Sequence, residues 1–237
     1  MNIFTQNLKI HNTWSDFISQ ENIKTALARI QTEIGENYTP AGGKALRFLE
    51  TDLSKVKVII LGQDPYPQQG VATGRAFEVG TLKSWDEKFK QSSLRNILRA
   101  VYVAYNEGEA PPTLTGVRCK MNSGEFEIAP PNKLFESLEK QGVLFLNTTF
   151  TCEIGNAGSH IKIWENFSEN LFRYISCANR RALWFLWGKN AHCYEKYARG
   201  GCYKCNHPML AGGKGENDFL KSKCFFDTKD TINWKGM

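Results

Sequence analysis

Long apolar runs that end in turn-forming residues mark the predicted strands. Such runs cover Val56–Leu61, Val143–Asn147 and Ala182–Trp187, and a shorter one lies near Tyr203–Asn206. Because their apolar residues are continuous and do not alternate with polar ones, we expect strands that are buried on both faces, as in a parallel sheet. The fold class that follows is α/β: a central four-stranded, mostly parallel, twisted sheet flanked by helices.

Segments with helical periodicity separate these strands. Apolar residues recur three to four positions apart in residues 14–30, 94–105 and 164–175, and Ser92-Ser93 are expected to cap the second of these helices. The stretch 107–132 is rich in Gly, Pro and polar residues, and we interpret it as an insertion with a hairpin that turns at residues 122–124. Since no repeats or low-complexity segments appear, residues 1–237 are expected to form a single domain.

The composition is that of a globular protein with a moderate basic excess. Hydrophobic residues make up 41% and charged residues 23%, and the net charge of +6 permits a nucleic-acid partner without requiring one. Seven Cys is an odd number, which excludes a complete set of internal disulfides. The chain shows neither an apolar leader nor the roughly 18 apolar residues of a membrane span. We therefore expect a cytoplasmic monomer with reduced thiols and no membrane contact.

The turn after the first strand carries the first candidate site residues. Val56–Leu61 runs directly into GQDPYP at Gly62–Pro67, so that Asp64 and Tyr66 project from a stiff turn at the carboxyl end of a buried strand. Open α/β sheets bind ligands at that edge. Taken alone, the turn is equally compatible with an ordinary exit from a strand, because Asp and Pro are common turn residues.

Three separated segments resemble the signature segments of the family-1 uracil-DNA glycosylases. They are Gly62–Tyr66 (GQDPY), Gly142–Thr149 (GVLFLNTT) and His207-Pro208, and further matches follow in order from Trp14 to Trp234. The resemblance covers nearly the whole chain. It implies the fold of that family and the release of uracil from DNA, the first step of base-excision repair, by an enzyme that needs no metal or cofactor and has no lyase step.

The resemblance also implies the two catalytic residues. Breaking the bond from deoxyribose C1′ to uracil N1 leaves a cationic sugar and a uracil anion, so a catalyst needs negative charge near the sugar and hydrogen-bond donors near the uracil oxygen. Asp64 would stabilise the cation and orient the attacking water. His207, in its neutral form, would donate a hydrogen bond to uracil O2, assisted by the backbone N–H groups around Gln63-Asp64.

Three further residues would bind the base, again by resemblance. Asn147 would read the polar edge of uracil, since an amide offers both a donor and an acceptor. Phe77 would stack on the base. Tyr66 would lie against uracil C5 and leave no room for a methyl group, which would exclude thymine.

Contacts to DNA are expected from residues around these two motifs. An enzyme that acts on a base must first flip it out of the stack, and Leu210 or Met209 would fill the gap. Ser93 would grip a phosphate, and Pro67 and Pro208 would lie beside the DNA backbone. The expected partner is uracil-containing DNA, single- or double-stranded, together with a proteinaceous glycosylase inhibitor. Further phosphate contacts could come from Lys204, Lys214, Lys221 and Lys223.

The chain departs from the family pattern at three places. Pro67 replaces the His that usually follows the Tyr of the first motif, the loop at 207–212 is shortened and lacks its usual Ser, and the segment 107–132 is longer than expected. We therefore expect uracil excision with an altered grip on DNA. Two alternatives are a glycosylase for a modified base and a DNA-binding scaffold with weak catalysis.

A cysteine motif allows a different interpretation of the chain near His207. The spacing Cys202-x-x-Cys205-x-His207, preceded by His192-Cys193, is compatible with zinc or an iron–sulfur cluster. A metal would require His207 to serve as ligand and as catalytic donor, and the chain has no second CxxC. We therefore expect no metal at this motif.

Overall fold

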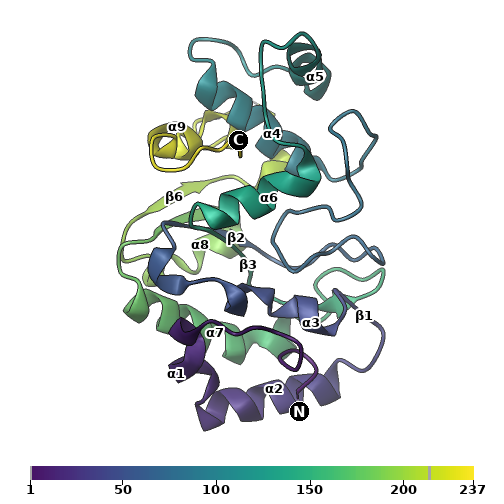
Figure 1. Ribbon diagram of the computed structural model, residues 1–237, viewed down its shortest axis with the longest axis vertical. Coiled ribbons are helices and arrows are strands. Elements are labelled where there is room, and N and C mark those ends of the chain that lie inside the picture. The colour runs from purple at the N-terminus through teal and green to yellow at the C-terminus, as the bar shows by residue number, and fades with distance from the viewer. Residues whose placement is uncertain (1, 213–214) are drawn as a thin grey trace.

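The computed structural model describes residues 2–212 and 215–237, which form three layers with helices on both faces of a central sheet (Figure 1). The two ends of the chain lie on opposite sides of the sheet, the N-terminal end below it and the C-terminal end above it in this view. None of the helices within the described ranges is long and apolar enough to cross a membrane.

Four parallel strands form the central sheet, in the order β3-β2-β5-β6. They are β2 (Val58–Gly62), β3 (Val143–Asn147), β5 (Leu183–Trp187) and β6 (Cys202–Cys205). The predicted α/β fold with a four-stranded sheet is confirmed, and this sheet is parallel throughout. The central strand β2 is buried at all five positions, which explains its uninterrupted apolar sequence.

Successive strand residues alternate between two apolar cores. In β2, Val58 and Ile60 pack in the core that faces α4, α6 and α9, called the upper core, whereas Ile59 and Leu61 pack in the core that faces α1, α2 and α7, called the lower core. A fully buried Ile or Leu stabilises a fold by about 1.5 to 3 kcal/mol. The turn that follows β2 is therefore anchored from both sides of the sheet.

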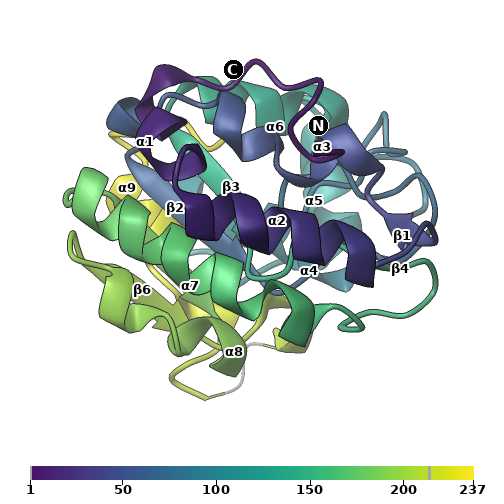
Figure 2. The ribbon, with the colours of Figure 1, turned by 90° about the horizontal axis from the view of Figure 1, so that it is seen from below.

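The helices divide between these two cores. On the upper side lie α4 (Ser92–Tyr105), α5 (Leu114–Asn122), α6 (Pro131–Lys140) and α9 (Cys224–Thr228), and on the lower side lie α1 (Ser15–Ile18), α2 (Glu21–Glu33), α3 (Gly42–Ala45), α7 (Ile161–Ala178) and α8 (Lys189–His192). Figure 2 shows α2 and α7 packed side by side across the lower face. Short 3₁₀ turns connect these elements: η1 (Asn12–Trp14), η2 (Arg47–Glu50), η3 (Leu53–Lys55), η4 (Glu195–Tyr197), η5 (Pro208–Leu210) and η6 (Phe219–Lys221).

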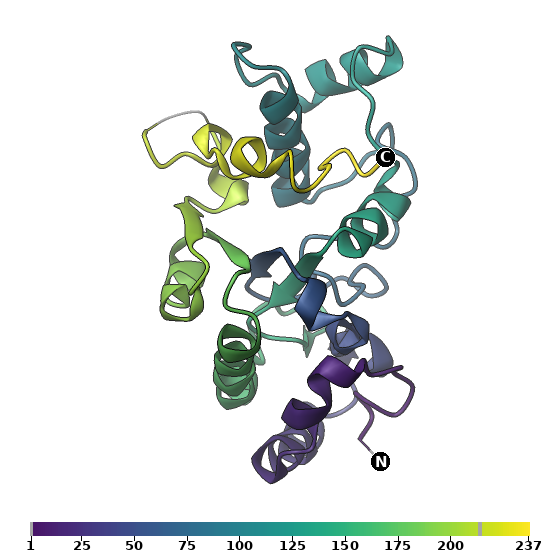
Figure 3. The same cartoon turned by 60° about the vertical axis from the view of Figure 1, so that its left-hand side comes forward.

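The segment 107–132 contains a helix where a hairpin was predicted, so that prediction is wrong. The helix is α5, and its first turn is capped by the Thr113 hydroxyl, which accepts a hydrogen bond from the Gly116 N–H at 3.2 Å. Val117 is fully buried and fastens α5 to the upper core. Figure 3 shows α5 beside α4, at the end of the molecule that lies away from the sheet.

Two local details also differ from the sequence-based predictions. Helix α4 begins after Gln91, and neither Ser92 nor Ser93 caps it, because both lie in its first turn. A small antiparallel sheet, which the sequence pattern did not predict, pairs β1 (Tyr38–Thr39) with β4 (Cys152–Glu153). Both strands are only two residues long, too short for a periodic pattern to reveal them.

The order of the strands opens a crevice at the carboxyl edge of the sheet. The chain leaves β2 toward the upper core, where α4 packs, and leaves β5 toward the lower core, where α8 packs. Adjacent strands whose connections diverge in this way are the usual place for a ligand in an open α/β sheet. The predicted site residues follow β2, β3 and β6 and meet at this edge.

Candidate active site

A pocket of about 320 Å³ lies at the carboxyl edge of the sheet. All of the predicted site residues line it except Pro208 and Leu210; those that do are Gln63, Asp64, Tyr66, Pro67, Phe77, Ser93, Asn147, His207 and Met209. They come from the turn after β2, the loop that follows it, the start of α4, the end of β3 and the turn after β6. The structure therefore brings together residues that are up to 146 positions apart in the sequence, from Gln63 to Met209.

The carboxylate of Asp64 is half-buried at the floor of the turn after β2. Its Oδ2 accepts a hydrogen bond from the backbone N–H of Gly158 at 2.6 Å. Burial raises the pKa of the Asp64 carboxyl above its ordinary value, and the bond from Gly158 acts in the opposite direction. The carboxylate is thus held in a fixed orientation in surroundings that do not fully solvate its charge.

The imidazole of His207 is also half-buried, and one of its nitrogens has a defined role. Its Nδ1 accepts a hydrogen bond from the Met209 N–H at 3.2 Å, so a neutral ring carries its proton on Nε2. Burial lowers the pKa of His207 below its ordinary value, which favours the neutral ring at neutral pH. Gly188 allows this placement, because a Cβ there would lie 2.9 Å from the His207 Cβ. The site therefore has a neutral donor at Nε2.

Asn147 and Gly62 are paired across β2 and β3 in the parallel register. A Cβ on Gly62 would overlap the Asn147 Oδ1, so only glycine leaves room for this amide above the strand. Asn147 is 5% exposed, and within the described residues its amide makes no hydrogen bond. Its donor and acceptor remain available to a ligand in the pocket.

Phe77 adopts a backbone conformation that is unusual for its residue type. Its φ of 66° is in the left-handed region, and no other described residue besides glycine has a positive φ. The ring lies 5.5 Å from the ring of Trp187 and 6.2 Å from that of His207, measured between centroids. The Tyr66 hydroxyl donates to the Phe77 carbonyl oxygen at 3.5 Å. The left-handed backbone at Phe77 therefore places an aromatic ring beside the imidazole.

The turn after β2 is fastened by its neighbours. The Gln63 carbonyl oxygen accepts hydrogen bonds from the Thr149 N–H at 2.9 Å and from the Thr148 hydroxyl at 2.9 Å. The Gln63 side chain turns toward Asn190 at the start of α8, whose amide donates to the Gln63 Oε1. Because the turn is bonded to β3 and to α8, its backbone N–H groups are held in place at the pocket.

Of the residues that were predicted to contact DNA, Pro67, Ser93 and Met209 line the pocket. Met209 and Leu210 are 59% and 68% exposed, unusual values for large apolar side chains. Both line a second cavity of about 310 Å³ that adjoins the first at Gln63 and His207.

Ser93 and Pro208 are buried, and the Pro208 carbonyl oxygen accepts a hydrogen bond from the Asn96 amide at 2.7 Å. Lys214 lies outside the described residues, whereas Lys204 pairs with Glu195 at 2.7 Å.

Four residues that sequence analysis did not single out contribute to the pocket. Gly158 and Asn190 orient Asp64 and Gln63, and Arg75 and Glu78 line the wall beside Phe77. Gly158 directly precedes Ser159-His160, one of the further matches to the family between Trp14 and Trp234, and this match was the available signal. Asn190 is separated from the motifs in sequence, and Arg75 and Glu78 lie within the loop that follows β2. Only the tertiary structure places these three residues at the site.

The cysteine motif does not form a chelating pair. Cys205 packs in the upper core and Cys202 against the lower core, on opposite faces of the sheet. Within residues 2–212 and 215–237, no group of three or more His, Cys, Asp or Glu side chains is arranged to hold a metal ion.

The geometry of this pocket is that of an enzyme active site. A half-buried carboxylate and a neutral imidazole share one small pocket with an unpaired amide and an aromatic ring, at the ligand-binding edge of an α/β sheet. Such a site can stabilise a cation on one side and a developing oxyanion on the other.

Comparison with known proteins identifies the family. The model of the uracil DNA glycosylase superfamily matches residues 48–225, and the chain belongs to this superfamily. The chain is 32% identical to the uracil-DNA glycosylase of Fusobacterium nucleatum, over 93% of this chain and 88% of that one. It is 31% identical to the uracil-DNA glycosylase of Aeromonas hydrophila, over 95% of each chain.

Solved structures agree with the fold. The wild-type UNG of Nitratifractor salsuginis has a TM-score of 0.71 to this structure, with 22% identity and coverage of 96% of this chain and 92% of that one. A variant of mimivirus UNG in complex with UGI has a TM-score of 0.62, with 21% identity over 84% of this chain and 70% of that one. The family resemblance predicted from the three signature segments is confirmed, and the protein is a glycosylase.

Proposed function

We propose that the protein is a monofunctional DNA glycosylase that hydrolyses the N-glycosidic bond of deoxyuridine, releases free uracil and leaves an abasic site. The observation that carries this proposal is that Asp64 and His207 line one pocket. Asn147 and Phe77 line the same pocket. The relatives named uracil-DNA glycosylase support the same substrate.

The reaction uses the two groups on opposite sides of the scissile bond. As the C1′–N1 bond breaks, its electron pair moves into the base, and negative charge develops on uracil O2. The Nε2–H of His207 donates a hydrogen bond to that oxygen, while the Asp64 carboxylate stabilises the cationic sugar. Water then adds to C1′, one of its protons passes to Asp64 or to solvent, and the uracil anion gains a proton to leave as neutral uracil.

Selectivity for uracil comes from the remaining pocket residues. The Asn147 amide pairs with the donor and acceptor edge of the base, and the Phe77 ring stacks on its face. Tyr66 occupies the position against C5, so a thymine methyl group has no space. A pocket of about 320 Å³ admits one base and no duplex, which requires the nucleotide to be flipped out before it can bind.

The same proposal includes the partners and the place of action. The substrate is uracil-containing DNA, single- or double-stranded, and the protein acts as a monomer in the cytoplasm. Met209 or Leu210 enters the gap that the flipped nucleotide leaves, because both are exposed beside the pocket. A proteinaceous inhibitor that covers this face would compete with DNA. The mimivirus UNG variant solved in complex with UGI supports such an inhibitor by analogy of fold.

A comparison of three matched oligonucleotides tests the proposal. Single strands that carry uracil, thymine or cytosine at one position are incubated with the enzyme in excess EDTA, and free base is measured together with alkali-sensitive sites. We expect release from the uracil strand only, with no strand break before alkali. Equal release from thymine, dependence on a metal, or no release from any strand would contradict the proposal.

A further inference from the structure

Another polar cavity lies beside α4, on the side where the segment 107–132 packs. Its volume is about 260 Å³, and it is lined by Ser92, Arg95, Asn96, Arg99, Thr113 and Leu114. Two guanidinium groups, two hydroxyl groups and an amide thus surround one small space, and none of the lining residues is acidic. This combination of donors matches a phosphate group.

The cavity is built by one face of α4 and by the start of the insertion helix. Residues 92, 95, 96 and 99 recur at helical spacing, so they share one face of α4. The Arg99 Nε donates to the Pro112 carbonyl oxygen at 2.6 Å, and its Nη1 donates to the Asn96 Oδ1 at 2.8 Å. Arg99 therefore ties the insertion to α4 and is held in a fixed orientation, with further N–H groups left for a ligand.

This cavity is connected to the active site through two contacts. Ser92 lines it, whereas the next residue, Ser93, lines the catalytic pocket. The Asn96 amide, which Arg99 contacts, donates to the Pro208 carbonyl oxygen in the turn that exposes Met209 and Leu210. The start of α4 therefore lies between the catalytic pocket and this cavity.

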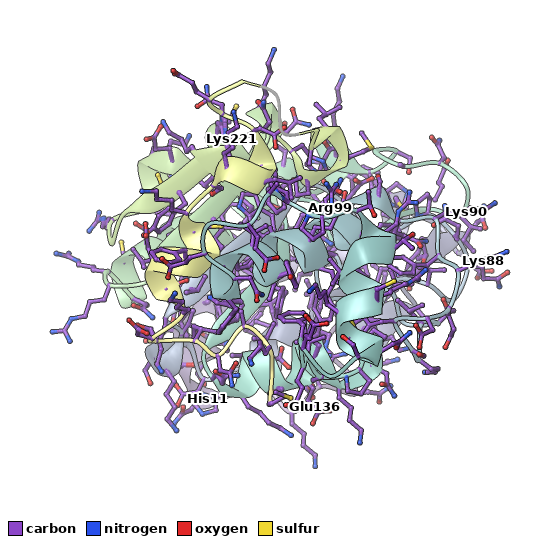
Figure 4. All side chains as sticks on the ribbon, turned by 90° about the horizontal axis from the view of Figure 1, so that it is seen from above. His11, Lys88, Lys90, Arg99, Glu136 and Lys221 are labelled. Carbon is purple, nitrogen blue, oxygen red and sulfur yellow. The ribbon has the colours of Figure 1, made fainter. Side chains whose placement is uncertain are left out.

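The surrounding charge favours an anion over the same face. Figure 4 shows Arg99 near the middle of the upper face, with Lys221 on one side of it and Lys88 and Lys90 on the other. The carboxylate of Asp218 attracts Arg99 and so offsets part of its charge, while it also accepts hydrogen bonds from the Gly212 and Leu220 N–H groups. The Arg95 Nη2 donates to the Lys90 carbonyl oxygen at 3.2 Å. Because this partner is a neutral backbone group, it does not neutralise the positive charge of Arg95.

We propose that this cavity is a phosphate subsite for the DNA strand, in which Arg95, Arg99 and Thr113 bind the backbone at a phosphate away from the flipped nucleotide. The inference rests on the proposed function for its ligand, a single DNA strand with a uracil. It gives the segment 107–132 a role: the segment completes the subsite by supplying Thr113 and by fixing Arg99. The subsite would supplement the grip on DNA, which we expect to be altered by the shortened loop after His207.

The salt dependence of DNA binding tests the subsite directly. The probe is a single strand with a tetrahydrofuran abasic-site analogue, which binds without turnover, and the variants are Arg95→Gln, Arg99→Gln, Arg95→Lys and the matched control Arg173→Gln. Arg173 is exposed on α7, on the other side of the sheet. Each lost phosphate contact lowers the slope of log affinity against log salt by about 0.7 on a single strand. We expect that loss for Arg95→Gln and Arg99→Gln, and the wild-type slope for Arg95→Lys and Arg173→Gln.

A length series locates the subsite along the strand. The probe is extended by one nucleotide at a time on its 5′ side and then on its 3′ side, and affinity is expected to rise stepwise on one side only in the wild type. Arg95→Gln should abolish that step. The proposal would be overturned if Arg95→Gln and Arg99→Gln both had the same salt slope and length profile as Arg173→Gln.

Inhibition by free uracil separates the two proposals. It reports on the catalytic pocket alone, so the variants of Arg95 and Arg99 should retain the wild-type inhibition constant. If uracil release fails in the wild type while the salt slope still responds to Arg95→Gln, then the proposed function is wrong and the phosphate subsite stands. If release is normal and the slope does not respond, then only the subsite is wrong.

Discussion

Arg75 and Glu78 form an ion pair at 3.2 Å with Phe77 between them in the chain, and their side chains are 8% and 9% exposed. Arg75 also contacts Glu139 of α6 at 2.5 Å, and Glu78 accepts a hydrogen bond from the Thr73 hydroxyl. Because the residues on both sides of Phe77 are fixed in this way, its left-handed backbone conformation persists despite the strain.

Removing Arg75 should therefore weaken base binding through Phe77. Arg75→Met leaves two carboxylates without their partner and is expected to lower the free energy of unfolding by about 3 to 5 kcal/mol. Glu78→Gln is milder, because it keeps the shape of the side chain and its hydrogen bond to Thr73. Both variants should raise the inhibition constant for free uracil. Chemical denaturation and competitive inhibition measure the two effects separately.

A double-mutant cycle decides whether the ion pair of Arg75 and Glu78 acts through the ring. In a Phe77→Ala background, Glu78→Gln should have no further effect on the affinity for uracil, because the ring that the ion pair positions is gone. Additive losses of affinity would show that Arg75 and Glu78 influence the pocket by another route.

The raised pKa of Asp64 predicts linked effects on activity and stability. Release of uracil should fall as the pH drops through that pKa, with a midpoint above the roughly 3.9 of an ordinary Asp, because the protonated carboxyl cannot stabilise a cation. Since the folded-state pKa is raised, ionisation of Asp64 destabilises the fold. Asp64→Asn should therefore increase the melting temperature at neutral pH, and the difference should shrink as the pH falls below the raised pKa and vanish below the ordinary pKa of Asp. Thermal melts across this pH range check the sign, which would be reversed if the carboxylate stabilised the fold.

Tyr66→Ala is expected to admit thymine. The phenol ring is the proposed wall against C5, and a single methyl group accounts for about 10- to 200-fold in discrimination. The variant should release thymine from a thymine strand at a measurable rate while its rate on uracil falls. A variant that is equally slow on both bases, or that still rejects thymine fully, would place the methyl group elsewhere in the pocket.

The exposed pair Met209 and Leu210 should matter on duplex DNA and not on single strands. A wedge compensates for the few kcal/mol that unstacking costs, so truncation of the true wedge is expected to lower the duplex rate by about tenfold. Met209→Ala and Leu210→Ala are compared on both substrates, and each variant is its own control through the single-strand rate. Equal losses on both substrates would indicate a role inside the pocket instead.

Sequence reasoning located the strands and the motif residues because local patterns specify them. The apolar run before Gly62 is buried on both faces, and Asn147 and His207 follow strands that the same reasoning recognised. The parallel sheet then brings the three positions to one edge. Contacts that depend on the tertiary structure could not be read in this way: the Gly158 N–H reaches Asp64 across 94 positions, and Arg75 reaches Glu139 across 64.

The segment 107–132 was predicted incorrectly for a related reason. Its Gly and Pro content suggested turns, but Leu114 and Val117 are spaced for a helix, and burial of Val117 against the upper core stabilises α5. A nine-residue helix is marginal on its own, and packing decides whether it forms. That packing is also what places Thr113 beside Arg99, a juxtaposition with no signature in the sequence.

Single-turnover release of uracil from one single-stranded oligonucleotide, measured for the wild type, Asp64→Asn and His207→Ala, tests the central assignment most directly. Asp64→Asn removes the charge that stabilises the sugar cation, and His207→Ala removes the donor to uracil O2. Each variant should reduce the rate by about 10²- to 10⁴-fold, with affinity for an abasic strand little changed. A wild-type rate in either variant would contradict the assignment of the pocket formed by Asp64 and His207 as the catalytic centre.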